Sequence, residues 1–261
     1  MNVASKANQA QNLSPRKEHT YLGGNLSFAA AEAYKLLRTN VLFALPDEGK
    51  SRLVGVTSAC LGEGKSTTAL NLALMLAEAG ESVLVVEADM RLPIIAKELN
   101  LKPAPGLSNL LAGLCTGDEA IQSSELHERL QILPSGDLPP NPSELLGSRQ
   151  MGHSLEMLTQ RYDFILLDLP PVTEVADALV ISKLVDGMIM VVRQDYTSRR
   201  AISAAMSQLR FVQAHILGFV VTWHDVMEKG GRYGKYGKYG RYGRKGYKYY
   251  AESTVKNDGG P

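Results

Sequence analysis

The sequence predicts an α/β fold with a mainly parallel sheet and helices on both faces. Apolar runs of strand length alternate along the chain with longer segments whose apolar residues recur at helical spacing. Strands joined through helices run parallel and are buried on both faces, which explains their near-continuous apolar character. The chain has 261 residues, enough for one such domain with a full core and flanking tails.

The expected elements follow the chain in order. A helix is predicted over 28–43, where apolar positions recur at helical spacing. Buried strands are predicted where the chain is apolar over strand length, at 53–56, 82–88, 164–169, 188–193 and 216–223, with a weaker candidate at 130–133. Helical patterns lie between these runs, at 66–79, 143–160, 175–185 and 199–212.

Composition divides the chain into three regions. Residues 1–25 are expected to form a flexible N-terminus, and residues 26–225 carry the alternating pattern of the folded domain. Residues 226–261 are expected to form a flexible tyrosine-rich tail. The stretch 230–250 consists only of Gly, Lys, Arg and Tyr, so it lacks the aliphatic residues that build a core.

Bulk properties favour a cytoplasmic protein. The formal net charge is +1, which points to no class of partner. No apolar run reaches the roughly 18–20 residues needed to cross a bilayer, and the polar N-terminus lacks the apolar core of a secretory signal. The two cysteines, Cys60 and Cys115, do not make a disulfide framework, so a reducing cytosol is expected.

A glycine-rich loop lies between the first apolar run and the helical segment that follows it. Its sequence from Ala59 is Ala-Cys-Leu-Gly-Glu-Gly-Lys-Ser-Thr, a variant of the pattern G-x-x-x-x-G-K-[ST] with Ala59 at the first glycine position. A strand, loop and helix with this sequence form a nucleotide-binding phosphate loop, or P-loop. The alternative is an ordinary glycine-rich turn, which rarely lies between a buried strand and a helix.

The residue types in this loop suit a phosphate chain. Gly62 and Gly64 permit positive φ, so backbone N–H groups can wrap the phosphates, and the following helix adds its positive N-terminal end. Lys65 is expected to reach the β- and γ-phosphates, and the Ser66 hydroxyl to ligate Mg²⁺. The predicted nucleotide-binding residues are Gly62, Glu63, Gly64, Lys65, Ser66 and Thr67.

Acidic residues end two of the predicted strands. Glu87 and Asp89 end one, with Arg91 two residues further on, and Asp168 ends another. Ligands of open α/β sheets bind at the carboxyl ends of strands, and Mg²⁺ prefers oxygen ligands. Asp168 is therefore a candidate ligand of Mg²⁺ or its water, and Asp89 a candidate ligand or base. Glu87 is a candidate for orienting water or the attacking group, and Arg91 for contacting phosphate or a neighbouring subunit. The alternative for each acid is a helix cap.

The tail concentrates seven of the chain's eleven tyrosines, at Tyr233, Tyr236, Tyr239, Tyr242, Tyr247, Tyr249 and Tyr250. Seven Lys or Arg residues are interleaved with them. Three interpretations are open. The tyrosines are phosphoacceptors on a flexible segment, in which case each phosphate adds about −1.5 to −2 charge. Alternatively they stack on the bases of a single-stranded nucleic acid, or the segment is a solvated linker.

Together these motifs resemble the bacterial tyrosine kinases of capsular and exopolysaccharide biosynthesis, the BY-kinases, over roughly residues 26–251. The phosphate loop is similar to the family's first motif, the strand ending in Glu87 and Asp89 to the second, and the strand ending in Asp168 to the third. The tail is similar to the family's tyrosine cluster. Further similar segments lie at 106–113, 133–136 and 141–146.

Two positions depart from the family pattern. The second motif normally has Asp at both acid positions, whereas this chain has Glu87, whose carboxylate reaches about a methylene further. The first predicted helix resembles the family's assembly motif, a Glu followed by Arg three and six residues later. Here the three positions are Glu32, Lys35 and Arg38. Lysine lacks the planar fork of arginine, so an interface built on bidentate pairing is expected to be weaker.

The resemblance implies a P-loop NTPase fold of deviant-Walker type and a kinase that uses ATP and Mg²⁺ to phosphorylate its own tail, in trans within an oligomer. Carried over, Lys65 holds the phosphates, while Ser66, Asp89 and Asp168 serve Mg²⁺. One carboxylate of the second motif, Glu87 or Asp89, helps to deprotonate the tyrosine. The implied catalytic group is Lys65, Glu87, Asp89, Arg91 and Asp168.

Implied partners are a separate transmembrane adaptor of the polysaccharide co-polymerase type, a homo-oligomeric ring and a cognate tyrosine phosphatase. The expected place is the cytoplasmic face of the membrane, through the adaptor, where the kinase regulates capsule synthesis and export; no nucleic acid is expected. The main alternative is a P-loop switch ATPase of the septum-site and chromosome-partitioning type. Those proteins usually carry a second lysine near the start of the loop, where this chain has Ala59, Cys60 and Leu61. A third possibility is a polyanion binder that uses the tail.

Overall fold

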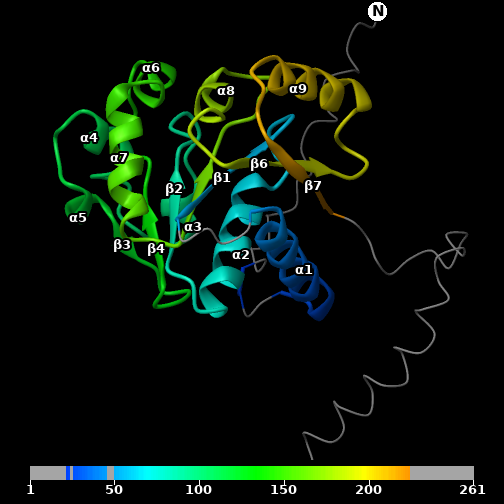
Figure 1. The fold of residues 1–261 in the computed structure, drawn as a ribbon, viewed down its shortest axis with the longest axis horizontal. Helices are drawn as coiled ribbons and strands as arrows, with labels where there is room; N and C mark the ends of the chain where they lie inside the picture. Colours follow the sequence, from blue (N-terminus) through cyan, green and yellow to red (C-terminus); the bar gives the residue numbers. More distant parts are fainter. Residues whose placement is uncertain (1–21, 24–25, 46–49, 224–261) are drawn as a thin grey trace, which may run out of the picture. The chain divides into compact units, whose positions relative to one another are not determined.

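The computed structural model describes residues 22–23, 26–45 and 50–223. Within them lies a seven-stranded sheet with the strand order β3-β4-β2-β5-β1-β6-β7 (Figure 1). The strands are β1 (Arg52–Ser58), β2 (Val83–Glu87), β3 (Gln122–Ser123), β4 (Leu130–Leu133), β5 (Phe164–Asp168), β6 (Gly187–Arg193) and β7 (Ile216–Thr222). Every pairing is parallel except that of the short edge strand β3 with β4. The predicted parallel sheet is therefore confirmed.

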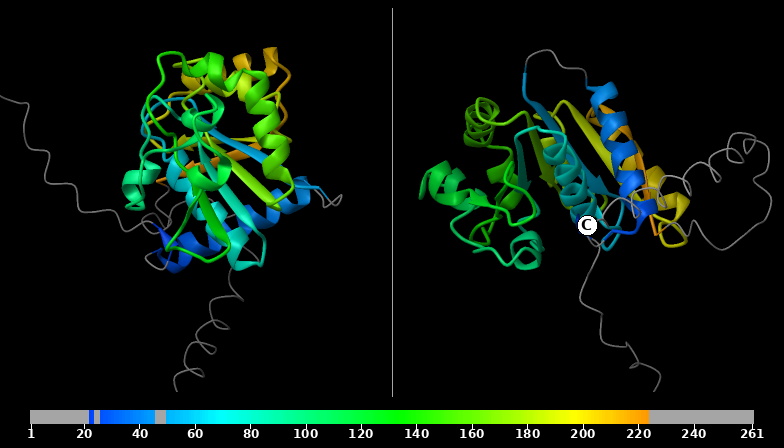
Figure 2. Two further views of the ribbon diagram at one scale, coloured as in Figure 1. Left: turned by 90° about the vertical axis from the view of Figure 1, so that its left-hand side faces the viewer. Right: turned by 90° about the horizontal axis from the view of Figure 1, so that it is seen from below.

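Helices cover both faces of the sheet (Figures 1 and 2). On one face, α1 (Phe28–Ala44) and α2 (Lys65–Glu78) share a core with β1, β2 and β5. On the other face, the core contains α7 (Arg149–Thr159), α8 (Asp177–Ile181) and α9 (Arg199–Phe211). Strands β1, β2 and β5 are buried along their whole length, as the near-continuous apolar runs predict.

The helix predicted over 143–160 is wrong as a single element. The chain instead forms α6 (Pro142–Leu146) and α7, which are separated by Gly147 and Ser148. Ser148 is the N-cap of α7, and its hydroxyl accepts a hydrogen bond from the Met151 N–H at 3.3 Å. The helix predicted over 175–185 is shorter, since α8 spans only Asp177–Ile181. Short elements at α3 (Ile95–Glu98), α4 (Leu107–Leu111), α5 (Gly117–Ala120) and β3 were not predicted.

Strand register places the polar residues at one edge of the sheet. Asp168 at the end of β5 is level with Glu87 at the end of β2 and with Val56 on β1. The glycine-rich loop leaves β1 two residues after Val56, so it starts beside both acidic strand ends. The carboxyl edge of the three central strands is therefore the place where the predicted site residues meet.

Two further expectations concern the whole chain. Both cysteines are free thiols, as expected for a protein without a disulfide framework. In the ranges 22–23, 26–45 and 50–223, no helix combines the length and the apolar character that a membrane span requires. The expected flexible regions 1–25 and 226–261 lie almost entirely outside the described residues.

Candidate functional site

The glycine-rich loop joins β1 to α2 with the predicted backbone geometry. Gly62 has a φ of 75° and Gly64 a φ of 88°, both in the left-handed region that favours glycine. Gly64 is also the N-cap of α2, so the positive end of a 14-residue helix opens onto the loop. A strand, two left-handed glycines and a helix N-terminus form a backbone cradle suited to an anion.

Lys65 lies between two carboxylates at this edge of the sheet. Its ammonium nitrogen is 2.9 Å from Oδ2 of Asp89 and 3.7 Å from Oδ1 of Asp168, and it lies 3.4 Å from the Ser66 hydroxyl. All four residues are buried. Burial by itself lowers the pKa of Lys65, but the charges of Asp168 and Asp89 outweigh it and raise that pKa above its ordinary value. The lysine is therefore charged, and the structure brings together the four residues predicted to bind phosphate and Mg²⁺.

Asp168 has the features of a metal-binding carboxylate. Burial raises its pKa from 3.8 to about 6, although Lys65 and the Ser66 hydroxyl oppose the shift. Among the described residues, its buried Oδ1 has no hydrogen-bond donor. A buried oxygen without a donor is costly and suits a cation ligand. The residues present therefore fit Mg²⁺ together with phosphate oxygens; in the described ranges no three His, Cys, Asp or Glu side chains gather into a complete metal site.

Asp89 uses its two oxygens differently. Oδ1 accepts hydrogen bonds from the backbone N–H groups of Arg91 at 3.3 Å and Leu92 at 3.1 Å. Oδ2 is the oxygen paired with Lys65. One oxygen thus holds the loop after β2, and the other faces the site.

Glu87 is fully buried beneath the same loop. Its Oε1 accepts hydrogen bonds from the backbone N–H groups of Ile94 at 2.6 Å and Ile95 at 2.5 Å, and its Oε2 from that of Ser135 at 3.2 Å. These contacts orient the carboxylate toward backbone and hold two loops against the strand end. A direct part for Glu87 in the chemistry stays a prediction.

The predicted site residue Arg91 points away from Lys65. Its guanidinium contacts Asp177 at the start of α8 and Ser143 on α6. It therefore links the loop after β2 to two helices on the α7–α9 face of the sheet.

The outer side of the phosphate loop is supported by residues that the sequence did not indicate. The buried carboxylate of Glu63 accepts hydrogen bonds from the Cys60 N–H at 2.8 Å and from the Thr197 hydroxyl. The Thr222 hydroxyl donates to the carbonyl of Glu63 at 2.7 Å, and Arg193 donates to the carbonyl of Gly62 at 3.3 Å. The ends of β6 and β7 therefore hold this loop.

Arg193 also stacks on two aromatic rings. Its guanidinium carbon lies 4.2 Å from the ring centre of Trp223 and 4.9 Å from that of Tyr196. A Cβ at Gly64 would lie 3.3 Å from Cζ3 of Trp223. Trp223 thus forms one wall of the phosphate loop and is the last described residue before the tail.

The predicted assembly residues lie on α1. Glu32 and Lys35 form an exposed ion pair at 2.9 Å, and Arg38 donates to the carbonyl of Met75 on α2 at 3.0 Å. Arg38 therefore fastens α1 to α2 within the chain. The predicted tyrosine phosphoacceptors lie outside the described residues.

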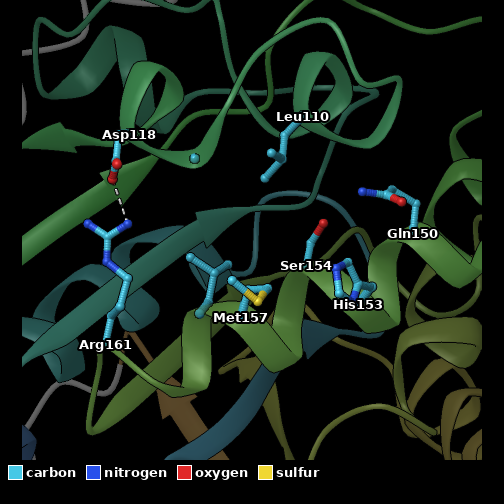
Figure 3. Close-up of a pocket in the computed structure, with 9 residues that line it drawn as sticks. Leu110, Asp118, Gln150, His153, Ser154, Met157 and Arg161 are labelled. Atoms are coloured by element: carbon cyan, nitrogen blue, oxygen red, sulfur yellow. Dashed lines mark hydrogen bonds and ion pairs between the residues drawn. The ribbon is translucent and has the colours of Figure 1, made fainter.

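A separate hollow of about 310 Å³ lies between α4, α5 and α7, away from the phosphate loop. Figure 3 shows Leu110 and Met157 on opposite sides of this hollow and the ion pair of Asp118 and Arg161, whose charged atoms lie 2.6 Å apart, at one end. The phosphate loop and the acidic strand ends contribute no residue to its lining.

Comparison with known proteins agrees with this geometry. A family model described as an AAA domain matches residues 51–218. The tyrosine-protein kinase YwqD of Bacillus subtilis is 36% identical over 191 residues, which cover 73% of this chain and 80% of YwqD. The chimerical protein CapA2B2 is similar in structure, with a TM-score of 0.69 at 36% identity over 73% of this chain and 83% of that one.

The kinase domain of the Escherichia coli tyrosine kinase ETK has a TM-score of 0.75 at 28% identity, with 85% of each chain covered. The septum site-determining protein MinD of Pyrococcus horikoshii, solved with Mg-ADP, has a lower TM-score of 0.55 at 26% identity, over 66% of this chain and 70% of its own. The match to the curated kinase exceeds 30% identity over most of its length. The chain therefore belongs to the bacterial tyrosine-protein kinases, the P-loop kinases known as BY-kinases, and is an enzyme of that class.

Proposed function

We propose that this kinase transfers the γ-phosphoryl group of Mg·ATP to the tyrosines of its own C-terminal tail, acting between neighbouring copies. The observation that carries the proposal is the buried group of Lys65, Asp89 and Asp168 beside the phosphate loop. In this group, one cation that can bind phosphate contacts two carboxylates that can bind a metal ion and accept a proton.

Each residue has a proposed task. The backbone of Gly62, Glu63 and Gly64, with Thr67 in the first turn of α2, surrounds the phosphates. Lys65 leaves its carboxylate partners to contact the β- and γ-phosphates. Ser66 and Asp168 would hold Mg²⁺ directly and Asp89 through water, which leaves Asp89 able to accept a proton, and Mg²⁺ when bound would neutralise charge on the phosphates.

Asp89 is the proposed acceptor of the tyrosine proton. Its Oδ2 faces Lys65, while backbone N–H groups fix its Oδ1, so the carboxylate is oriented before substrate binds. In the same loop, Glu87 already accepts three backbone N–H groups. The contrast favours Asp89 over Glu87 as the base.

The start of the tail supports tail phosphorylation. Strand β7 ends at Thr222, whose hydroxyl is hydrogen-bonded to the carbonyl of Glu63 in the phosphate loop, so the last described residues before the tail lie close to the loop. A flexible chain of about twenty residues spans roughly 25 Å. That distance allows the tail to reach a neighbour's site.

Assembly is supported by the surface of α1. Three large apolar side chains are spaced along this helix, with exposed fractions of 73% for Phe28, 62% for Leu36 and 83% for Phe43. Large exposed apolar side chains on one helix favour contact with another copy. A ring of copies, a transmembrane adaptor of the co-polymerase type, a cognate phosphatase and control of capsule export are the wider setting proposed from the family resemblance.

We further propose that phosphorylation loosens the assembly, because seven phosphates would change the tail's charge by roughly −10 to −14 and the tails would repel one another. Size measurement of fully phosphorylated and dephosphorylated protein tests this. An unchanged oligomeric mass would contradict it.

Intact-mass spectrometry after incubation with Mg·ATP tests the kinase proposal, with Lys65→Met as the inactive control. The expected result is a series of phosphoryl additions that map to 230–251 and are absent in the control. ATP hydrolysis without tail modification would instead favour the switch-ATPase alternative.

A further inference from the structure

Asp177 is a buried carboxylate to which neither the motifs nor the proposed chemistry assign a role. It is the first residue of α8 and has no exposed surface. A carboxylate so deeply buried requires strong partners. Its partners come from two other segments, the loop after β2 and helix α6.

The main partner is the guanidinium of Arg91. Nε lies 3.0 Å from Oδ2 of Asp177 and Nη2 lies 3.2 Å from Oδ1, which is the bidentate arrangement of a strong ion pair. The Ser143 hydroxyl donates to Oδ1 of Asp177 and accepts from Nη2 of Arg91 at 3.1 Å. Three side chains from three segments thus close one hydrogen-bonded ring.

Arg91 connects this ring to the phosphate site through its own backbone. The Arg91 N–H donates to Oδ1 of Asp89, and Oδ2 of Asp89 pairs with Lys65. Asp177 is therefore two contacts away from the carboxylate that faces the lysine. A displacement of Arg91 would move the N–H that orients Asp89.

The segments that the ring joins are those that carry the chemistry. Arg91 lies in the loop after β2, and Asp177 begins the helix that follows the loop after β5. That second loop also contacts the start of the phosphate loop, since the Thr173 hydroxyl donates to the carbonyl of Ala59 at 2.6 Å. The Asp177 ring thus joins the loop that follows Glu87 and Asp89 to the segment that follows Asp168.

We propose that Asp177 is a positioning residue for phosphoryl transfer. Acting through Arg91, and supported by Ser143, it holds Asp89 in the orientation that faces Lys65. The inference rests on the proposed role of Asp89 in the chemistry. It adds a requirement for a carboxylate and a guanidinium that do not touch the nucleotide.

The test compares Asp177→Asn with wild type in the full chain. Asparagine keeps the shape but loses the charge that holds Arg91, so kcat for transfer to the tail is expected to fall about 100-fold, since a small misplacement in an active site costs that much. The dissociation constant for ADP is expected to change less than about threefold. Asp118→Asn, which breaks the exposed ion pair with Arg161, is the matched control and leaves kcat unchanged.

A double-mutant cycle separates positioning from simple structural support. If Asp177 acts through Arg91, then Arg91→Gln and Asp177→Asn each reduce kcat, and the double variant loses little more than either one. A double variant whose loss of kcat is the product of the two single losses would overturn the proposal. If Asp177→Asn fails to fold, Ser143→Ala removes one ring member without leaving a buried charge unpaired, and a kcat equal to wild type would then overturn it.

The rate of ADP production from ATP is measured together with the rate of phosphoryl transfer to the tail. The two rates separate the role of Asp177 from the proposal that the tail is the acceptor. Absence of tail phosphorylation in wild type would count against the proposed function alone. Asp177→Asn releasing ADP at the wild-type rate would overturn the role of Asp177 whether or not the tail is the acceptor.

Discussion

The ammonium of Lys65 lies 2.9 Å from Oδ2 of Asp89, so the predicted phosphate ligand and the predicted base neutralise each other inside the buried site. Phosphate must therefore displace a carboxylate from the lysine. In the proposed function, Lys65 exchanges one of these carboxylates for the phosphates, which leaves that carboxylate to Mg²⁺.

Asp168→Asn is expected to stabilise the nucleotide-free protein at pH 8. The pKa of Asp168 is raised to about 6 in the folded protein, so its ionised form costs folding free energy, and the cost grows as the pH rises from about 4 to about 6. Removing the charge should raise the free energy of unfolding by up to about 3 kcal/mol and abolish Mg²⁺-dependent transfer. Urea denaturation at pH 8 measures it, and below pH 4 the two proteins should be equally stable. Lower stability at pH 8 would contradict this account.

Gly64→Ala is expected to weaken nucleotide binding more than tenfold. Its φ of 88° strains alanine by about 1–2 kcal/mol, and the added Cβ would meet Trp223 at 3.3 Å. Gly80→Ala is the matched control, because Gly80 has a φ of 99° but no atom within 4 Å of the added Cβ. Calorimetric titration with ADP and thermal melts compare the two. Both variants should have a lower melting temperature than wild type, and equal ADP affinities of the two variants would contradict the role of Gly64 in nucleotide binding.

Trp223 should report nucleotide binding by its fluorescence. It is the single tryptophan of the chain and contacts both Arg193 and the phosphate loop. Trp223 packs against the phosphate loop, where ADP is proposed to bind. The charge of bound ADP is therefore expected to change the fluorescence emission of Trp223. Lys65→Met should keep the starting emission and lose most of the response. An emission that stays constant at saturating ADP in wild type would rule out this coupling.

Glu87→Asp, which restores the residue usual in the family, is expected to destabilise the protein. The shorter side chain draws the carboxylate away from the N–H groups of Ile94 and Ile95, which now lie at 2.6 and 2.5 Å. Leaving buried N–H groups unsatisfied costs about 1–3 kcal/mol. Urea denaturation and transfer rates are the readouts. An aspartate variant as stable as wild type and more active would mean that Glu87 is a catalytic carboxylate misplaced by its longer side chain.

The central sheet could be predicted from the sequence because buried parallel strands such as β1 and β5 are apolar without interruption. The elements missed are those of five residues or fewer, such as α3 and α4, whose short helices depend on tertiary contacts. The break between α6 and α7 had a local signal, since Gly147-Ser148 combines a glycine with a good N-cap.

The inner site was also predictable, whereas its support was not. Lys65, Asp89 and Asp168 belong to motifs at strand ends, and strand register brings them together. Arg193 and Thr222 act on the phosphate loop from 131 and 159 residues away, at positions that form no local motif. The role proposed for Asp177 likewise could not be predicted from the sequence, because it depends on the contact with Arg91 that only the fold creates.

Transfer between copies is the central claim, and one mixing experiment tests it most directly. A full-length donor with all seven tail tyrosines changed to phenylalanine is incubated with Mg·ATP and a Lys65→Met acceptor that keeps its tyrosines. The account predicts phosphoryl additions on 230–251 of the inactive acceptor, found by mass spectrometry, at a rate that rises with donor concentration. An acceptor that stays unmodified, while wild type alone modifies its tail, would contradict transfer in trans.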